Sequence, residues 1–365
     1  MFIKTSHHHT LITLKNYEYG SASNCTLPDG CRHCVNGSKM VLFITGRCNT
    51  GCFYCPISPE KKGNESMFAN ERRITNFSEM LEEAESMDAT GTGITGGDPL
   101  AAMDRTISAI KTLKEHFGPD HHIHLYTSDI NLEKSKALCE AGLDEIRFHP
   151  PMTQWETMDF KVVSEIMSKT SLEVGMEVPA IPGNEERLER LIVSASERGV
   201  KFININEFEF SESNWNMMEE MGFSVKDDLS SAVAGSEEMA THLMKKYPTY
   251  PIHFCSSAFK DGVQLRKRLI RRADVIAEKY DVVTDDGTII KGVVYADDLN
   301  AAADALLGLK VPKDLMFIDE QRKRIEVASW KLRKISKKLP YRSYIIEEYP
   351  TFDRMEVERT PLEHK

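Results

Sequence analysis

The chain of 365 residues is 41% hydrophobic and 28% charged, so it can bury a sizeable core and form two domains or one barrel with extensions. Its 46 Lys and Arg against 56 Asp and Glu give a formal net charge of −10, which argues against a protein that coats nucleic acid or an anionic membrane surface. No apolar run approaches the ~20 residues of a membrane helix, and the first residues lack the apolar stretch of a secretory signal, so we expect a cytoplasmic protein with no membrane contact.

From residue 40 onward, short apolar runs alternate with amphipathic segments. The run 40–45 predicts a buried strand, and Asn76 with Glu79 predicts the capped start of a helix. Further strands, each followed by a helix or a turn into one, are predicted at 93–95, 122–127, 145–148, 172–178 and 202–208. Six such units predict a parallel sheet with helices outside it. Since a closed barrel has eight, we expect an α/β fold built on a partial (β/α)6 barrel, with the active site at the C-terminal strand ends.

Beyond residue 214 the regular alternation of predicted strands and helices ends. Helices are predicted at 236–247 and 261–280, a hairpin at 281–290 around Asp286-Gly287, a long basic helix at 319–339 and a strand at 342–348. We therefore expect a cysteine-rich N-terminal cap (1–39), a core (40–230) and a mixed α+β C-terminal extension (231–365) that contributes Cys255.

Six of the eight cysteines fall between residues 25 and 55, and in a reducing cytosol such crowding favours metal ligation over disulfides. Cys48, Cys52 and Cys55 follow the first strand with C-x3-C-x2-C spacing. Three thiolates on one loop can hold three irons of a [4Fe–4S] cube, leaving the fourth iron open for a small ligand. A structural zinc site requires four protein ligands, and this spacing offers only one Cys-x2-Cys pair.

This motif resembles that of the radical S-adenosylmethionine (SAM) superfamily. The resemblance implies that the open iron binds SAM, and that the reduced cluster cleaves SAM to methionine and a 5′-deoxyadenosyl radical, which abstracts hydrogen from a substrate. It also implies that Tyr54 lies against the adenine. The Gly96-Gly97-Asp98 turn after the second strand corresponds to the Gly-Gly-Glu-type turn that seats the methionine group, with Asp in place of the usual Glu.

Polar residues at later strand ends are weaker candidates for contacts with SAM or substrate, and ordinary solvent-facing positions are the alternative. They are Ser128, Arg147, His149, Glu177, Asn206 and Glu207. Ser128 and Glu177 are the two that we assign to SAM.

A second group of cysteines, Cys25, Cys31 and Cys34, lies in a turn-rich segment upstream of the first strand. Such a segment buries little apolar surface, so a bound metal would explain how it is held. Cys255 ends an apolar run and could complete a set of four thiolates. We expect an auxiliary [4Fe–4S] cluster, with zinc as the competitor and a loop without metal as the remaining alternative. His33 could replace one thiol, but we favour a solvated spacer, and Cys139 is expected to be a small core residue.

The resemblance thus implies a radical SAM enzyme that takes its electron from a ferredoxin- or flavodoxin-type donor and acts on a protein, a peptide or a tRNA. The chain also resembles uncharacterised proteins related to pyruvate formate-lyase activating enzymes, so the activation of a glycyl-radical enzyme is the alternative. A non-enzymatic iron–sulfur or zinc protein is the alternative from another class. The basic segment 260–272 is either a solvated helical face or a groove for an acidic substrate.

Overall fold

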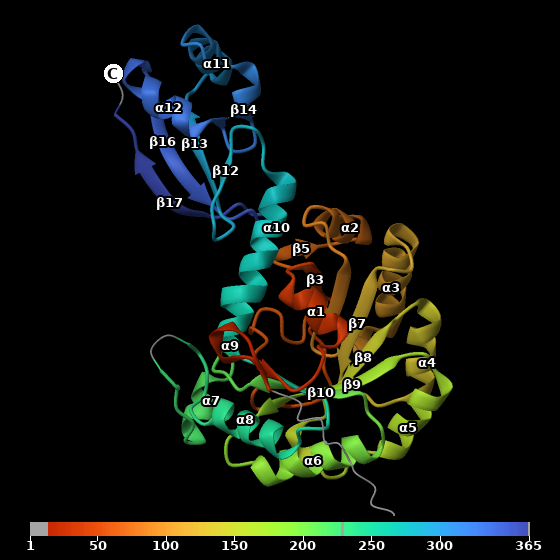
Figure 1. Ribbon diagram of the computed structural model, residues 1–365. Coiled ribbons are helices and arrows are strands. Elements are labelled where there is room, and N and C mark those ends of the chain that lie inside the picture. Colours follow the sequence, from red (N-terminus) through yellow and green to blue (C-terminus); the bar gives the residue numbers. More distant parts are fainter. Residues whose placement is uncertain (1–13, 228–229, 364–365) are drawn as a thin grey trace, which may run out of the picture.

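The computed structural model describes residues 14–227 and 230–363, which fold into a large α/β body and a smaller C-terminal domain (Figure 1). The strands are β1 (Lys15–Asn16), β2 (Ala22–Ser23), β3 (Lys39–Phe43), β4 (Met67–Ala69), β5 (Arg72–Ile74), β6 (Gly91–Thr95), β7 (His122–Thr127), β8 (Glu145–Phe148), β9 (Glu173–Ala180), β10 (Phe202–Glu207), β11 (Ile252–Cys255), β12 (Val282–Val283), β13 (Ile289–Tyr295), β14 (Met316–Asp319), β15 (Arg324–Val327), β16 (Arg342–Glu348) and β17 (Glu356–Pro361). The helices are α1 (Asp29–Val35), α2 (Phe77–Glu85), α3 (Met103–Phe117), α4 (Leu132–Ala141), α5 (Phe160–Lys169), α6 (Glu185–Glu197), α7 (Trp215–Glu220), α8 (Ser236–Lys246), α9 (Ser257–Phe259), α10 (Arg266–Ile276), α11 (Leu299–Gly308) and α12 (Ser329–Ile335), with a π-helical turn η4 (Lys260–Leu265) between α9 and α10.

The large body is built on one sheet with the strand order β1-β2-β11-β10-β9-β8-β7-β6-β3-β4-β5. The strands from β11 to β3 in this order are parallel to one another. Six of them are the predicted units, which confirms the α/β fold with a parallel sheet. The seventh, β11, lies beyond the predicted core boundary at residue 230, yet it pairs with β10 along its whole length, from Ile203↔Ile252 to Asn206↔Cys255. The C-terminal ends of all these strands meet at one edge, where the predicted site residues are found.

The two faces of this sheet differ in chemistry. Alternate strand residues such as Leu42, Ile123 and Ile203 are fully buried in the hydrophobic core under the outer helices. The positions between them carry polar side chains, among them Lys39, His124, Arg147, Glu177, Asn204 and His253. The chain covers this polar inner face with its own N-terminal segment.

Helix α1 is the element that covers the inner face; it contacts β3, β6 and β7 and lies across the sheet in Figure 1. The amide of Gly30 donates to Glu145 Oε2 at 3.1 Å. A Cβ atom on Gly30 would come within 2.6 Å of His124 Nδ1, so the approach of this helix to the strands requires glycine. The cap is therefore a helix seated on the inner face, where the sequence suggested only a turn-rich segment.

The C-terminal domain packs α11 and α12 on a second sheet with the order β14-β15-β13-β16-β17, and β12 pairs with β13. The predicted hairpin is confirmed, since Val283 pairs with Ile289. Helix α10 runs between the two bodies (Figure 1), and its basic residues pair with carboxylates: Arg268 with Glu71, Arg271 with Asp88 and Arg272 with Glu83. The prediction of a solvated basic face is wrong for Arg272, which is buried.

The prediction of one long basic helix at 319–339 is also wrong. The segment instead forms the end of β14, the strand β15 and the short helix α12. Arg324 is buried, and its guanidinium donates to Glu326 on the same strand, to Glu348 on β16 and to Glu356 on β17. A basic residue that pairs across strands cannot be told from a solvated one by its charge alone.

Candidate active site

A cavity of about 530 Å³ opens at the C-terminal edge of the parallel strands. Its lining includes the following predicted residues: Cys48, Cys52, Cys55, Tyr54, Gly96, Gly97, Ser128 and Glu177. Residues from separate strands and from the cysteine loop thus come together at one place, as the partial-barrel interpretation requires. His149, Asn206 and Glu207, the weaker candidates, also line it.

The three thiols project from the loop that follows β3. The Thr50 hydroxyl lies between two of them, 3.0 Å from Cys48 Sγ and 3.7 Å from Cys52 Sγ. The loop is closed at its base, because the Gly46 amide donates to Asn64 O at 2.7 Å and the Gly63 amide donates to Gly46 O at 2.8 Å. Three free thiols on a fixed loop that faces a cavity form the donor set that a cluster with one open iron needs.

The glycines of the Gly96-Gly97 turn make room for the cysteine loop. A Cβ atom on Gly97 would stand 2.3 Å from Arg47 O, and one on Gly96 would stand 2.5 Å from Thr45 O. The Gly97 amide donates to Thr45 O at 2.7 Å, and the Asp98 amide donates to Arg47 O at 2.7 Å. The turn and the cysteine loop are therefore joined backbone to backbone, and only glycine allows this distance.

Asp98 differs from the expectation for this turn, since its side chain does not line the cavity. It is buried and accepts hydrogen bonds from Leu100, Thr127 and Ser128. Asp98 therefore positions the turn and does not face the cavity.

Tyr54 lies in the cavity wall with its ring buried among Phe53, Phe208 and His149. His149 Nδ1 lies 2.7 Å from Glu177 O, and because a carbonyl can only accept, Nδ1 carries the proton. This leaves Nε2 as an acceptor, 3.4 Å from the Tyr54 hydroxyl. Burial lowers the pKa of His149, so the ring is neutral at pH 7.

Glu177 is the anionic group of the cavity. Arg147 Nη1 donates to its Oε2 at 2.8 Å, and Asn206 Nδ2 donates to its Oε1 at 2.9 Å. Burial alone would raise the pKa of Glu177, but the Arg147 guanidinium, the Asn206 amide and the Lys39 charge together outweigh it, so the pKa is lowered and the carboxylate stays ionised.

The sequence did not single out Lys260 or Glu209 as site residues. Both line the cavity, and Lys260 Nζ lies 3.1 Å from Glu209 Oε1. Lys260 belonged to the predicted basic helix, but it sits in the π-helical turn that carries it to the cavity. The pairing of a lysine after β11 with a glutamate after β10 could have been found only by recognising β11 as a core strand.

The second group of cysteines lies apart from this cavity, between α1 and β11, and is described below. His33 is not beside these thiols: its ring stacks on His122, and Nδ1 lies 2.9 Å from Thr90 Oγ1. Cys139 is half-buried in α4, and its Sγ lies 3.3 Å from Ser171 Oγ. Within residues 14–227 and 230–363, no three His, Cys, Asp or Glu side chains are placed to share one metal ion.

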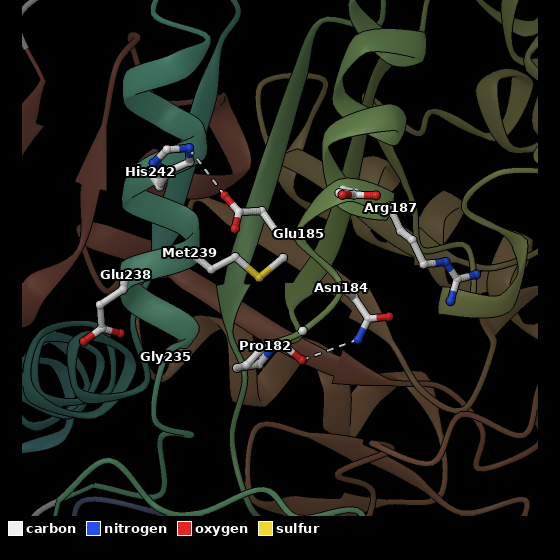
Figure 2. Close-up of a pocket in the computed structure, with 10 residues that line it drawn as sticks. Pro182, Asn184, Glu185, Arg187, Gly235, Glu238, Met239 and His242 are labelled. Atoms are coloured by element: carbon white, nitrogen blue, oxygen red, sulfur yellow. Dashed lines mark hydrogen bonds and ion pairs between the residues drawn. The ribbon is translucent and has the colours of Figure 1, made fainter.

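A larger hollow of about 960 Å³ lies on the surface between the β9–α6 loop and α8 (Figure 2). Glu185 and His242 face each other across it, and Met239 lies between the two helices. None of its lining residues is a cysteine. The thiol-lined cavity is therefore the candidate active site.

The chain matches two known domain families and is similar to known proteins. Residues 42–205 match the Radical SAM superfamily, and residues 287–362 match DUF8061, a domain of unknown function. A Methanocaldococcus jannaschii protein named "Putative glycyl-radical enzyme activating enzyme" is 41% identical over 355 residues, which cover 92% of this chain and 93% of that protein. A Methanococcus aeolicus protein named "Probable GTP 3',8-cyclase" is 30% identical over 168 residues, 45% of this chain and 48% of that protein.

Among solved structures, Streptococcus suis SuiB bound to its precursor peptide SuiA matches with a TM-score of 0.43 and 11% identity, over 60% of this chain and 48% of that one. No helix in the described part of the chain is both long and apolar enough to span a bilayer. The near-complete relative and the superfamily match together show that the chain belongs to the radical SAM superfamily, whose cofactors are a [4Fe–4S] cluster and S-adenosylmethionine.

Proposed function

We propose that this radical SAM enzyme removes a hydrogen atom from a glycine of a partner protein and so activates a glycyl-radical enzyme. The observation that carries the proposal is the relative with that name, which matches nearly the whole chain, C-terminal domain included. It favours the activase alternative over the modification of a peptide or a tRNA. The expectation of a non-enzymatic iron–sulfur or zinc protein is wrong, because both the superfamily and this relative are enzymes.

We assign Cys48, Cys52 and Cys55 to the catalytic cluster and the Gly96-Gly97 turn to the methionine group of SAM. When bound and reduced, a cluster held by these three cysteines would supply the electron that cleaves SAM to methionine and a 5′-deoxyadenosyl radical, and this radical would take the glycine hydrogen to give 5′-deoxyadenosine. The electron comes from an external donor of the ferredoxin or flavodoxin type. The partner is left with one unpaired electron on a glycine, so atoms and electrons balance.

The residues of the chain orient and protect this chemistry. The Tyr54 ring offers a flat apolar surface for the adenine, and His149 Nε2 offers an acceptor beside it. Glu177, which Arg147 keeps ionised, and Ser128 can bind the ribose hydroxyls. The buried aromatic residues around Tyr54 exclude water from this side of the cavity. All eight cysteines are free, which suits the reducing cytoplasm where we place the reaction.

The first test is the release of 5′-deoxyadenosine. Anaerobically reconstituted full-length protein, reduced with dithionite and mixed with SAM, should release 5′-deoxyadenosine. Cys55→Ala should abolish this release, while Cys139→Ala, a thiol outside both cysteine groups, should retain it. No release from protein with a full cluster would overturn the assignment of the site.

The second test concerns glycine. A glycyl-radical enzyme from the same organism, labelled with α-deuterated glycine, serves as the probe. Deuterium in the 5′-deoxyadenosine, together with an organic radical signal in electron paramagnetic resonance (EPR) spectra, supports the proposal. Release of 5′-deoxyadenosine that never carries deuterium, even with this partner in excess, contradicts glycine activation but leaves the SAM site intact.

A further inference from the structure

The cysteines outside the C-x3-C-x2-C motif, Cys139 excepted, lie on or beside α1 and β11, and Cys25 Sγ is 3.9 Å from Ile252 O. Cys25 follows β2, Cys31 and Cys34 lie on α1, and Cys255 ends β11. Strand β2 pairs antiparallel with β11, and α1 contacts the π-helical turn η4 that follows Cys255. Two stretches that are distant in sequence, residues 22–35 and 252–265, thus lie side by side, and none of the four cysteines lines the cavity or belongs to the C-terminal domain.

The side chain of Gln264, in η4, lies between two of these thiols. Cys34 Sγ donates to Gln264 Oε1 at 2.7 Å, and Gln264 Nε2 donates to Cys255 Sγ at 3.5 Å. A π-helical turn is less favourable than an α-helical one and is frequent at functional sites. Here it brings the Gln264 amide into the gap between Cys34 and Cys255.

Two of the four thiols are buried, and one of these contacts a charged side chain. Cys31 and Cys255 are each 5% exposed. Arg147 Nη2 donates to Cys31 Sγ at 3.3 Å. Arg147 also pairs with Glu145 and Glu177, and its remaining N–H group is directed at the sulfur atom, where a metal-bound thiolate would accept a charge-assisted hydrogen bond.

A buried histidine in the same region lacks a partner. His253 Nδ1 lies 2.5 Å from Asn204 Oδ1, so Nδ1 carries the proton and Nε2 bears the lone pair. His253 Nε2 is buried and finds no hydrogen-bond partner among the described residues. His253 is the register partner of Ser23, whose Oγ lies 3.3 Å from Cys25 Sγ. An unpaired buried nitrogen is unfavourable, which is a second indication that this region holds a polar group besides the protein.

We propose that Cys25, Cys31, Cys34 and Cys255 hold a second [4Fe–4S] cluster between α1 and β11. The Gln264 amide separates the sulfurs of Cys34 and Cys255. Ligands of one zinc ion would both lie about 2.3 Å from the metal, whereas a cube gives each thiolate its own iron and spans a wider gap. The separation therefore favours the cluster over zinc.

A single side chain, that of Arg147, connects the proposed second cluster to the active site. The same Arg147 guanidinium that contacts Cys31 Sγ donates through Nη1 to Glu177 Oε2, and Glu177 lines the cavity. Arg147 is a positioning residue for both. A change of charge on the second cluster acts on Arg147 and, through it, on the carboxylate in the cavity.

The decisive experiment removes the first cluster. Full-length protein with Cys48, Cys52 and Cys55 all replaced by Ala is reconstituted anaerobically with iron and sulfide. We expect about four iron atoms and four sulfides per chain, and a cluster EPR signal after reduction. Because three thiolates can still hold a cube, two of the four are then replaced together: Cys34→Ser with Cys255→Ala should remove both the iron and the signal, whereas Cys139→Ala should leave them unchanged. Cys34→Ser is included because this side chain is only half-buried and tolerates the change better than Cys255.

Circular dichroism and thermal unfolding confirm that each variant is folded before iron is counted. A folded triple variant without iron would overturn the proposal, as would one zinc per chain in place of iron. A second readout is the Arg147→Lys change in the triple variant, which should alter the EPR signal of the second cluster without changing its iron content. None of these measurements uses SAM or a partner protein, so their outcome does not depend on whether glycine activation is correct.

Discussion

Ser128 donates twice to one oxygen of Asp98: its hydroxyl lies 2.6 Å and its amide 2.9 Å from Asp98 Oδ2. The other oxygen accepts from Thr127 Oγ1 at 2.8 Å and from the Leu100 amide at 3.0 Å. One buried carboxylate therefore ties the turn after β6 to the end of β7. Because both of its oxygens are satisfied by the protein, Asp98 acts on the SAM seat through the turn that it holds.

Replacing Asp98 by Asn should weaken SAM binding. The amide turns an NH2 group toward two of the four donors, and the lost bonds to a charged acceptor are worth about 1.5–3 kcal/mol each. We expect SAM affinity to fall about ten- to a hundredfold with the iron content unchanged, measured by equilibrium binding to the reconstituted protein. Ser128→Ala removes one bond and keeps the amide, so its effect should be smaller. Equal losses in the two variants would mean that the proposed contact of the Ser128 hydroxyl with the ribose, and not the turn that Asp98 holds, accounts for the SAM affinity.

Substitutions of Tyr54 can distinguish the role of its ring from the role of its hydroxyl. The ring is buried, while the hydroxyl has only a long contact to His149. Tyr54→Phe should therefore keep the KM for SAM within about twofold, whereas Tyr54→Ala should raise it strongly and destabilise the fold by about 3–5 kcal/mol. Both are measured as 5′-deoxyadenosine release and urea unfolding. A Phe variant as impaired as the Ala variant would assign the role to the hydroxyl.

The sequence predicted those parts of the molecule whose signals are local. The strand that runs into Cys48 and the Gly96-Gly97 turn are each encoded within a few residues, and the cavity follows from placing parallel strand ends together. The seventh strand, β11, was not recognised because an irregular stretch and two helices separate its four residues from β10. Lys260 was missed with it.

Long-range pairing explains the other differences. The Pro28-Asp29-Gly30 stretch has turn composition, but the turn is the start of α1, and Glu145 on a distant strand accepts from its Gly30 amide. Arg324 belongs to a strand because carboxylates of β15, β16 and β17 surround it. Both depend on partners that no local pattern reveals.

The contact between the two bodies depends on Arg272. Its buried guanidinium donates to Glu83 Oε1 at 2.5 Å, and also to the Ser86 hydroxyl and to Pro350 O. Arg272→Ala should cost about 3–5 kcal/mol, because it leaves the Glu83 charge buried and unpaired. It should also expose the junction of the bodies to limited proteolysis. The matched control is Arg266→Ala, which breaks an exposed pair with Asp286 and should cost about 1 kcal/mol or less. Similar losses in the two variants would exclude a special role for the Arg272 contact.

The last prediction concerns acid stability of the C-terminal domain. Burial alone would raise the pKa of Glu326, but Lys291, Arg354 and Arg324 outweigh it and lower the pKa from 4.5 to about 2. Because the folded pKa is the lower one, the stabilisation is present above pH 4.5 and is lost as the pH falls toward 2. A shift of this size corresponds to about 3 kcal/mol.

Unfolding of this domain can be followed separately by Trp330 fluorescence after Trp155 and Trp215 are replaced by Phe, since the chain has three tryptophans. In this background the free energy of unfolding, measured in urea, should fall between pH 4.5 and pH 2. Glu326→Gln should lower stability at pH 7 and flatten the dependence over the same interval, because it removes the titrating group but leaves the surrounding cations. A variant with the same slope as the parent would show that other carboxylates cause the acid sensitivity.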